Sequence, residues 1–113
     1  MTSSESVDAY RAVRLEYNVL ERLEVRQLLP PDSRIADMRL DIVLQRRDRS
    51  ELIVLEFSGV RNLRFAQSET SVHEMVLEIT SIAERQWENL NYAVTDQDDG
   101  VSFLCDRVTF RRQ

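Results

Sequence analysis

The run Met38-Arg39-Leu40-Asp41-Ile42-Val43-Leu44 is followed by the polar stretch Arg46-Arg47-Asp48-Arg49-Ser50 and then by Leu52-Ile53-Val54-Leu55-Glu56-Phe57. Side chains in a strand point alternately to opposite sides, so the alternation in both apolar runs predicts strands with one buried face. The polar stretch between them is typical of a connection between antiparallel strands. Gly59-Val60 leads into a third run, Leu63-Arg64-Phe65, which we interpret as the next strand. These residues predict an antiparallel meander.

The two strands of this meander have expected limits at about Ile35 to Arg46 and about Glu51 to Ser58. Both faces of the second strand are fairly apolar, which favours a central place in the sheet. Gly59 can adopt a left-handed or bulged backbone conformation without a side-chain penalty. We therefore expect a bend at Gly59.

The rest of the sheet is expected from the second half of the chain. The periodicity of 71–90 fits either a helix or a strand. The density of β-branched and apolar residues in 72–80 favours a strand, and the capping-box spacing of Ser81 and Glu84 favours a helical turn after it. Alternating residues in 90–94 and 101–105, separated by the turn residues 96–100, predict a terminal hairpin. We expect the last three residues, 111–113, to fray.

The N-terminal segment has the pattern of a helix. Thr2 and Glu5 have the spacing of a capping box, and apolar residues recur at helical intervals to predict a helix from about Ser4 to Glu24. A second apolar stripe widens the face enough for a helix lying across a sheet. Its members are Ala12, Leu15, Val19 and Leu23. Pro30-Pro31 ends the helical segment and leads into the sheet. The prediction is an α+β fold, with this helix packed on a meander of about five to six strands, in a single domain spanning 1–113.

Composition excludes several classes of function. The chain has 113 residues and a formal net charge of −5, which disfavours nucleic acid as a partner. No apolar run approaches the roughly 20 residues of a membrane-spanning helix. The single cysteine, Cys105, cannot form an intramolecular disulfide, so a reducing cytoplasm is the expected location. We find no motif for a cofactor, and the acidic turn 96–100 does not match the spacing of a calcium loop.

Catalysis is the first alternative to a binding role. His73 is the only histidine, so an imidazole base would have to be this residue, and a small hydrolase or lyase would use it with Glu74 or Cys105. Cys105 alternates with Val101 and Phe103, a pattern typical of a buried small hydrophobic residue. No catalytic residue or metal site is therefore assigned from the sequence.

Five residues are the candidate partner-binding set. Arg46, Arg47 and Arg49 form one compact basic cluster, and Trp87 beside Arg85 has the character of an interface anchor. They favour a non-catalytic domain that binds a protein partner. Self-association, as a homo-oligomeric structural unit, is the other alternative, because a strand that is apolar on both faces can leave one face needing cover.

Two blocks carry a resemblance to a family. One is Leu55-Glu56-Phe57-Ser58-Gly59-Val60-Arg61-Asn62-Leu63, and the other runs from Ile79 through Arg85-Gln86-Trp87-Glu88 to Cys105. They resemble small bacterial domains of unknown function, some of which are grouped as immunity proteins of toxin systems. The resemblance covers roughly the C-terminal half of the chain. It implies a cytoplasmic protein that binds and blocks one partner, and the negative net charge suits a basic toxin.

Overall fold

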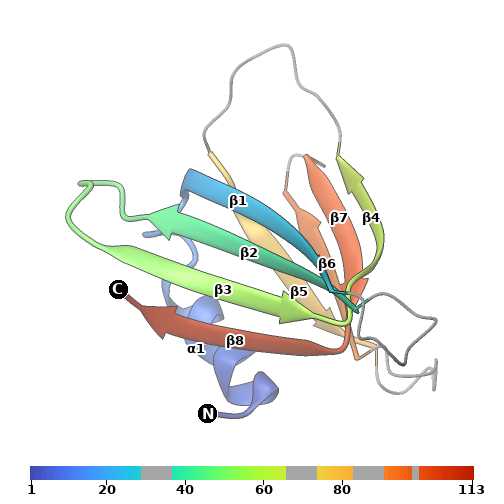
Figure 1. Ribbon diagram of the computed structural model, residues 1–113. Helices are drawn as coiled ribbons and strands as arrows, with labels where there is room; N and C mark the ends of the chain where they lie inside the picture. Colours follow the sequence, from blue (N-terminus) through green and yellow to red (C-terminus); the bar gives the residue numbers. More distant parts are fainter. Residues whose placement is uncertain (29–36, 66–73, 83–90, 98–99) are drawn as a thin grey trace.

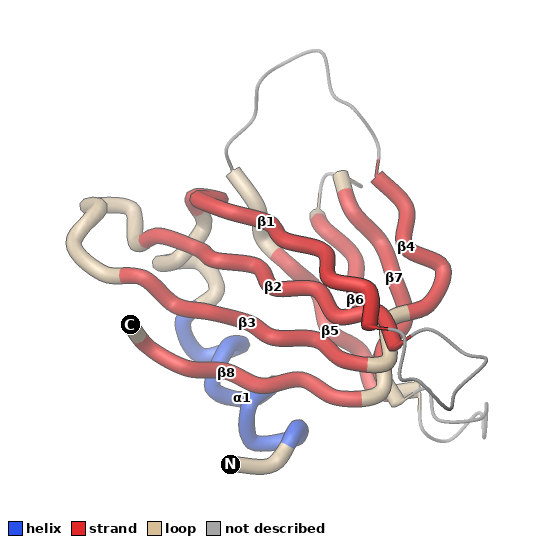
Figure 2. Tube along the Cα trace, viewed as in Figure 1, coloured by secondary structure: helices blue, strands red, loops and turns tan. Residues whose placement is uncertain are grey.

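The computed structural model describes residues 1–28, 37–65, 74–82, 91–97 and 100–113. Within these residues the chain forms one helix and eight strands: α1 (Ser3–Val13), β1 (Val19–Leu28), β2 (Asp37–Gln45), β3 (Leu52–Ser58), β4 (Arg61–Phe65), β5 (Leu77–Ser81), β6 (Tyr92–Asp96), β7 (Val101–Cys105) and β8 (Arg107–Arg112). The strands form two four-stranded antiparallel sheets, sheet A in the order β1-β2-β3-β8 and sheet B in the order β4-β7-β6-β5 (Figures 1 and 2). The α+β class is confirmed, but the strands are more numerous than predicted and do not form a single meander.

Helix α1 starts where the sequence predicts and ends much earlier. The side chain of Thr2 accepts a hydrogen bond from the backbone N–H of Glu5 at 3.1 Å, and Glu5 accepts one from the backbone N–H of Thr2 at 3.3 Å. This confirms the capping box, which satisfies two backbone donors that the helix leaves free. The helix ends at Val13, so the predicted continuation to Glu24 is wrong.

The last residues of the predicted helix, 19–24, belong instead to strand β1. It pairs with β2 from Val19↔Gln45 to Leu28↔Asp37, and the register shifts between Leu20 and Arg22. This bulge inserts one extra residue, so Leu20 and Leu23 are three positions apart yet both pack against the core. A spacing of three is the helical interval, which explains why the periodicity suggested a helix here.

The centre of sheet A follows the prediction. Strands β2 and β3 lie within the expected limits, and β3 is an interior strand between β2 and β8. Their inward side chains are buried in a core that both sheets share, as the alternation predicted. In β2 and β3 the fully buried members are Leu40, Ile42, Leu44, Ile53, Leu55 and Phe57.

Within the described residues, the chain passes from one sheet to the other at two corners. The first is Gly59-Val60, between β3 and β4, where Gly59 has the left-handed φ of 64°. The second is Asp106, between β7 and β8, whose backbone N–H donates to the carbonyl of Ser58 at 2.9 Å. The bend expected at Gly59 is confirmed, but it sends β4 into sheet B beside β7, not back along β3.

The later strands are partly as predicted. Strand β5 is Leu77–Ser81, shorter than the expected 72–80, while 83–90 lies outside the described residues. β6 and β7 pair as the expected hairpin. The hairpin is not terminal, because β8 follows and pairs with β3 from Ser58↔Arg107 to Ile53↔Arg112. Arg111 and Arg112 therefore belong to a strand and are not a frayed end.

Helix α1 closes the side of the molecule between the edge strands β8 and β5. The Ser3 hydroxyl accepts from the backbone N–H of Val108 at 3.1 Å, and the Tyr10 hydroxyl accepts from that of Leu77 at 2.9 Å. Tyr10 is fully buried, and desolvation raises its pKa to about 12. In Figure 1 the helix lies beside β8, with sheet A nearest the viewer. One core therefore joins the helix to both sheets.

Candidate partner-binding surface

The arginine turn, residues 46–50, joins β2 to β3 and holds three of the predicted partner-binding residues. Its backbone is closed by hydrogen bonds from the N–H of Arg46 to the carbonyl of Glu51 at 2.8 Å and from the N–H of Arg49 to the carbonyl of Arg46 at 2.7 Å. The carboxylate of Asp48 accepts from the backbone N–H of Ser50 at 3.0 Å. These bonds hold the arginines on a defined backbone.

The turn is tied to the segment that follows α1. The backbone N–H of Arg47 donates to the carbonyl of Glu16 at 3.0 Å. The hydroxyl of the buried Tyr17 donates to the carboxylate of Glu51, and this bond raises the pKa of Tyr17. Two segments about thirty residues apart in sequence thus form one surface.

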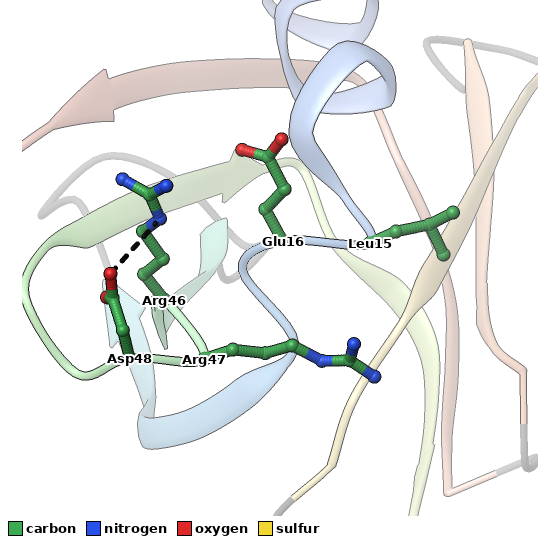
Figure 3. Close-up of a pocket in the computed structure, with 5 residues that line it drawn as sticks. All are labelled: Leu15, Glu16, Arg46, Arg47 and Asp48. Carbon is green, nitrogen blue, oxygen red and sulfur yellow. Dashed lines mark ion pairs between the residues drawn. The ribbon is translucent and has the colours of Figure 1, made fainter.

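A hollow of about 420 Å³ lies where these segments meet. Its lining comprises Leu15, Glu16, Arg46, Arg47 and Asp48 (Figure 3). Leu15 is 65% exposed, and in Figure 3 its side chain and that of Arg47 extend to the same side. The hollow therefore offers an apolar side chain next to a guanidinium group, which is the mixture that protein interfaces use.

The charged side chains of the arginine turn have different neighbours. Arg46 lies 3.7 Å from Asp48, and both side chains are substantially exposed. Hydrogen bonds from Ser50 and the charge of Arg46 lower the pKa of Asp48. Arg47 also lines a second hollow of about 310 Å³ together with Arg49. An exposed ion pair contributes little to stability, so these side chains are free to be used in binding.

Arg49 has an unfavourable backbone conformation, with a φ of 63°. Replacement of Arg49 by glycine should raise the free energy of unfolding by about 0.5–1 kcal/mol. Glycine has no Cβ, so it avoids the steric penalty that other residues have in the left-handed conformation. Arg47→Gly is the matched control, since Arg47 does not have a positive φ and glycine there should be destabilising. Urea denaturation of both variants measures the difference. A stability loss in Arg49→Gly equal to that in Arg47→Gly would contradict the expectation.

The structure describes only some of the remaining predicted functional residues. Trp87, Arg85 and His73 lie outside the described residues. Glu74 is exposed, and its carboxylate accepts a hydrogen bond from Asn18 at 3.3 Å. Cys105 is fully buried, as expected, and desolvation raises its thiol pKa to about 12. A thiol in that state is a poor nucleophile at neutral pH.

The basis for self-association is weaker in the structure than in the sequence. Val54 lies on the side of β3 that faces away from the core, yet only 2% of it is exposed in the single chain. Its neighbour across β2, Val43, is equally buried. These two outward-facing valines are thus already covered within the single chain.

In the part of the chain that the structure describes, no group of three or more His, Cys, Asp and Glu side chains is arranged to hold a metal ion. The helix found in these residues is too short to span a membrane.

Two features of the surface were not foreseen from the sequence. Leu15 was expected on the buried face of a long helix, and it is exposed because the helix ends at Val13. Arg22 was likewise expected on that helix and Arg26 just after it, and both lie instead on the outer side of sheet A. The position of these arginines depends on the bulge in β1, and a bulge leaves no clear signal in a single sequence.

The described residues thus define a small α+β domain with two antiparallel sheets and charged, shallow surface hollows. A family model for "Immunity protein PIM8" matches residues 2–111. The chain belongs to this family of immunity proteins, and the match extends well beyond the C-terminal half in which we saw the resemblance. No curated protein and no solved structure matches the chain.

Proposed function

We propose that this protein is an immunity protein that binds a protein toxin and blocks it in the cytoplasm of the cell that makes both. The family match over residues 2–111 carries this proposal. A function of this kind needs a stable scaffold with a specific surface and requires no catalytic group.

The arginine turn is the contact surface that we propose for the toxin. Its hydrogen bonds order the backbone in advance, which reduces the entropy lost on binding. Arg49 keeps a bulky side chain at a backbone position that favours glycine, and natural sequences retain such a cost mainly at functional sites. Arginine is also among the residues most enriched in binding hot spots. Trp87 and Arg85 remain predictions for the same interface.

The test begins with the genes beside the one for this protein, where the proposal expects a toxin gene, and uses the toxin domain encoded there. Co-expression with the wild-type chain should restore growth to cells producing the toxin, and the two purified proteins should form a complex in isothermal titration calorimetry. Arg47→Gln/Arg49→Gln should weaken the affinity by about tenfold or more, since two exposed contacts are removed.

The matched control is Arg61→Gln/Arg64→Gln, which removes the same charge from exposed arginines of β4. Its affinity should stay within about threefold of wild type, corresponding to less than 1 kcal/mol. Absence of both complex and growth rescue with the wild-type chain would overturn the immunity role. Equal losses in the two double variants would remove the arginine turn from the interface.

A further inference from the structure

The outer side of sheet A carries a concentration of arginine. Directly paired residues of neighbouring strands point to the same side, so the register identifies the side chains facing away from the core. Five arginines share that side, here called the arginine face: Arg22, Arg26, Arg39, Arg107 and Arg111. Among the residues whose side chains the structure describes, three acidic residues share this side: Glu24, Asp41 and Glu56. This side is therefore net positive in a chain whose formal charge is −5.

Two of these acidic residues, Asp41 and Glu56, are engaged by arginines. A guanidinium nitrogen of Arg26 lies 2.6 Å from a carboxylate oxygen of Asp41, whose side chain is only 14% exposed. Arg111 donates to Glu56 at 2.9 Å. The two carboxylates hold their arginines in place, and each guanidinium keeps further N–H donors because it has five.

A hollow of about 210 Å³ lies at one end of the arginine face. Arg26, Arg39 and Arg107 line it, together with the paired carboxylates of Asp41 and Glu56. Arg107 is 77% exposed, and its contact with the adjacent Asp106 is long, at 3.7 Å. Guanidinium groups around a hollow with engaged carboxylates favour entry of another carboxylate, since planar N–H pairs match its two oxygens.

We infer that the arginine face docks on an acidic surface of the partner protein, with an aspartate or glutamate side chain of the partner entering the hollow. The inference rests on the proposed function, since the toxin is taken as the partner. Complementary charge is the argument for this occupant. A protein suits the face better than nucleic acid does, because the interspersed Asp41 and Glu56 would oppose a continuous row of phosphates.

Charge reversal in the hollow tests the inference. Arg107→Glu should weaken binding to the adjacent-gene toxin domain by about tenfold or more, because the incoming carboxylate would meet a like charge. The wild-type affinity should also fall as salt is raised, and this dependence should be shallower in Arg107→Glu. Arg107 is chosen because its loss leaves the pairs of Arg26 and Arg111 intact.

Arg64→Glu is the matched control, since Arg64 is also an exposed arginine in an edge strand but belongs to sheet B. It should change the affinity by less than about threefold, or under 1 kcal/mol. Circular dichroism should show both variants folded. A complex that tolerates Arg107→Glu as well as Arg64→Glu overturns the inference and leaves the immunity role standing. Absence of any wild-type complex overturns both.

A parallel titration with duplex DNA separates the two kinds of anionic partner. The wild-type protein should not bind the DNA through Arg107, so Arg107→Glu should not abolish any DNA binding that the wild type shows. Binding of DNA that is as tight as that of the toxin domain and lost in Arg107→Glu would assign the arginine face to nucleic acid and overturn the protein-docking inference.

Discussion

Phe57→Ala should lower the free energy of unfolding by about 3–5 kcal/mol, the usual cost of truncating a buried aromatic residue to alanine. Phe57 is 1% exposed and lies on β3 between Leu40 of β2 and Val108 of β8. Its ring meets that of Phe103 from sheet B edge to face, with centroids 4.8 Å apart and planes at 77°. Removal of the ring leaves a cavity where the two sheets join.

Guanidinium chloride unfolding of the variant, followed by circular dichroism, measures this loss. Phe65→Ala is the matched control, because Phe65 is the same residue type but 55% exposed at the end of β4. The control should change stability by no more than about 0.5 kcal/mol. If the two phenylalanine variants unfolded at the same denaturant concentration, the conclusion that Phe57 belongs to a core shared by the two sheets would be wrong.

Gly59→Ala should lower the free energy of unfolding by about 2–5 kcal/mol through two separate costs. The φ of 64° is a left-handed conformation that alanine adopts at a penalty of about 1–2 kcal/mol. A Cβ on Gly59 would also lie 2.8 Å from the Cβ of Asp106, closer than two carbon atoms can pack. Overpacking of this kind adds about 1–3 kcal/mol.

A double-mutant cycle separates these costs. Asp106→Gly removes the atom that the new methyl group would meet, so Gly59→Ala should be less harmful in that background than in the wild type. Ser58→Ala, one residue earlier in β3, is the control and should stay within about 0.5 kcal/mol of wild type. Additive effects of Gly59→Ala and Asp106→Gly would show that the two corners of the fold are not in contact.

The candidate site was only partly accessible to sequence reasoning. The cluster of Arg46, Arg47 and Arg49 was visible as a run of charges, and its position in a turn followed from the alternating residues on either side. Its contact with Glu16 was not visible, because that contact depends on where α1 ends. The arginine face was hidden for a related reason. Its members come from β1, β2 and β8, and only strand pairing brings them to one side of a sheet.

Patterns between near neighbours sufficed for the start of α1 at its capping box, for strands β2 and β3, and for the hairpin of β6 and β7. Each depends on residues only a few positions apart, so the chain specifies it locally. The tertiary structure decided that Val19–Leu28 is a strand and that β4 leaves β3 for sheet B. Strand pairing decided both, because backbone groups and apolar side chains are satisfied by partners distant in sequence, which a local pattern does not identify.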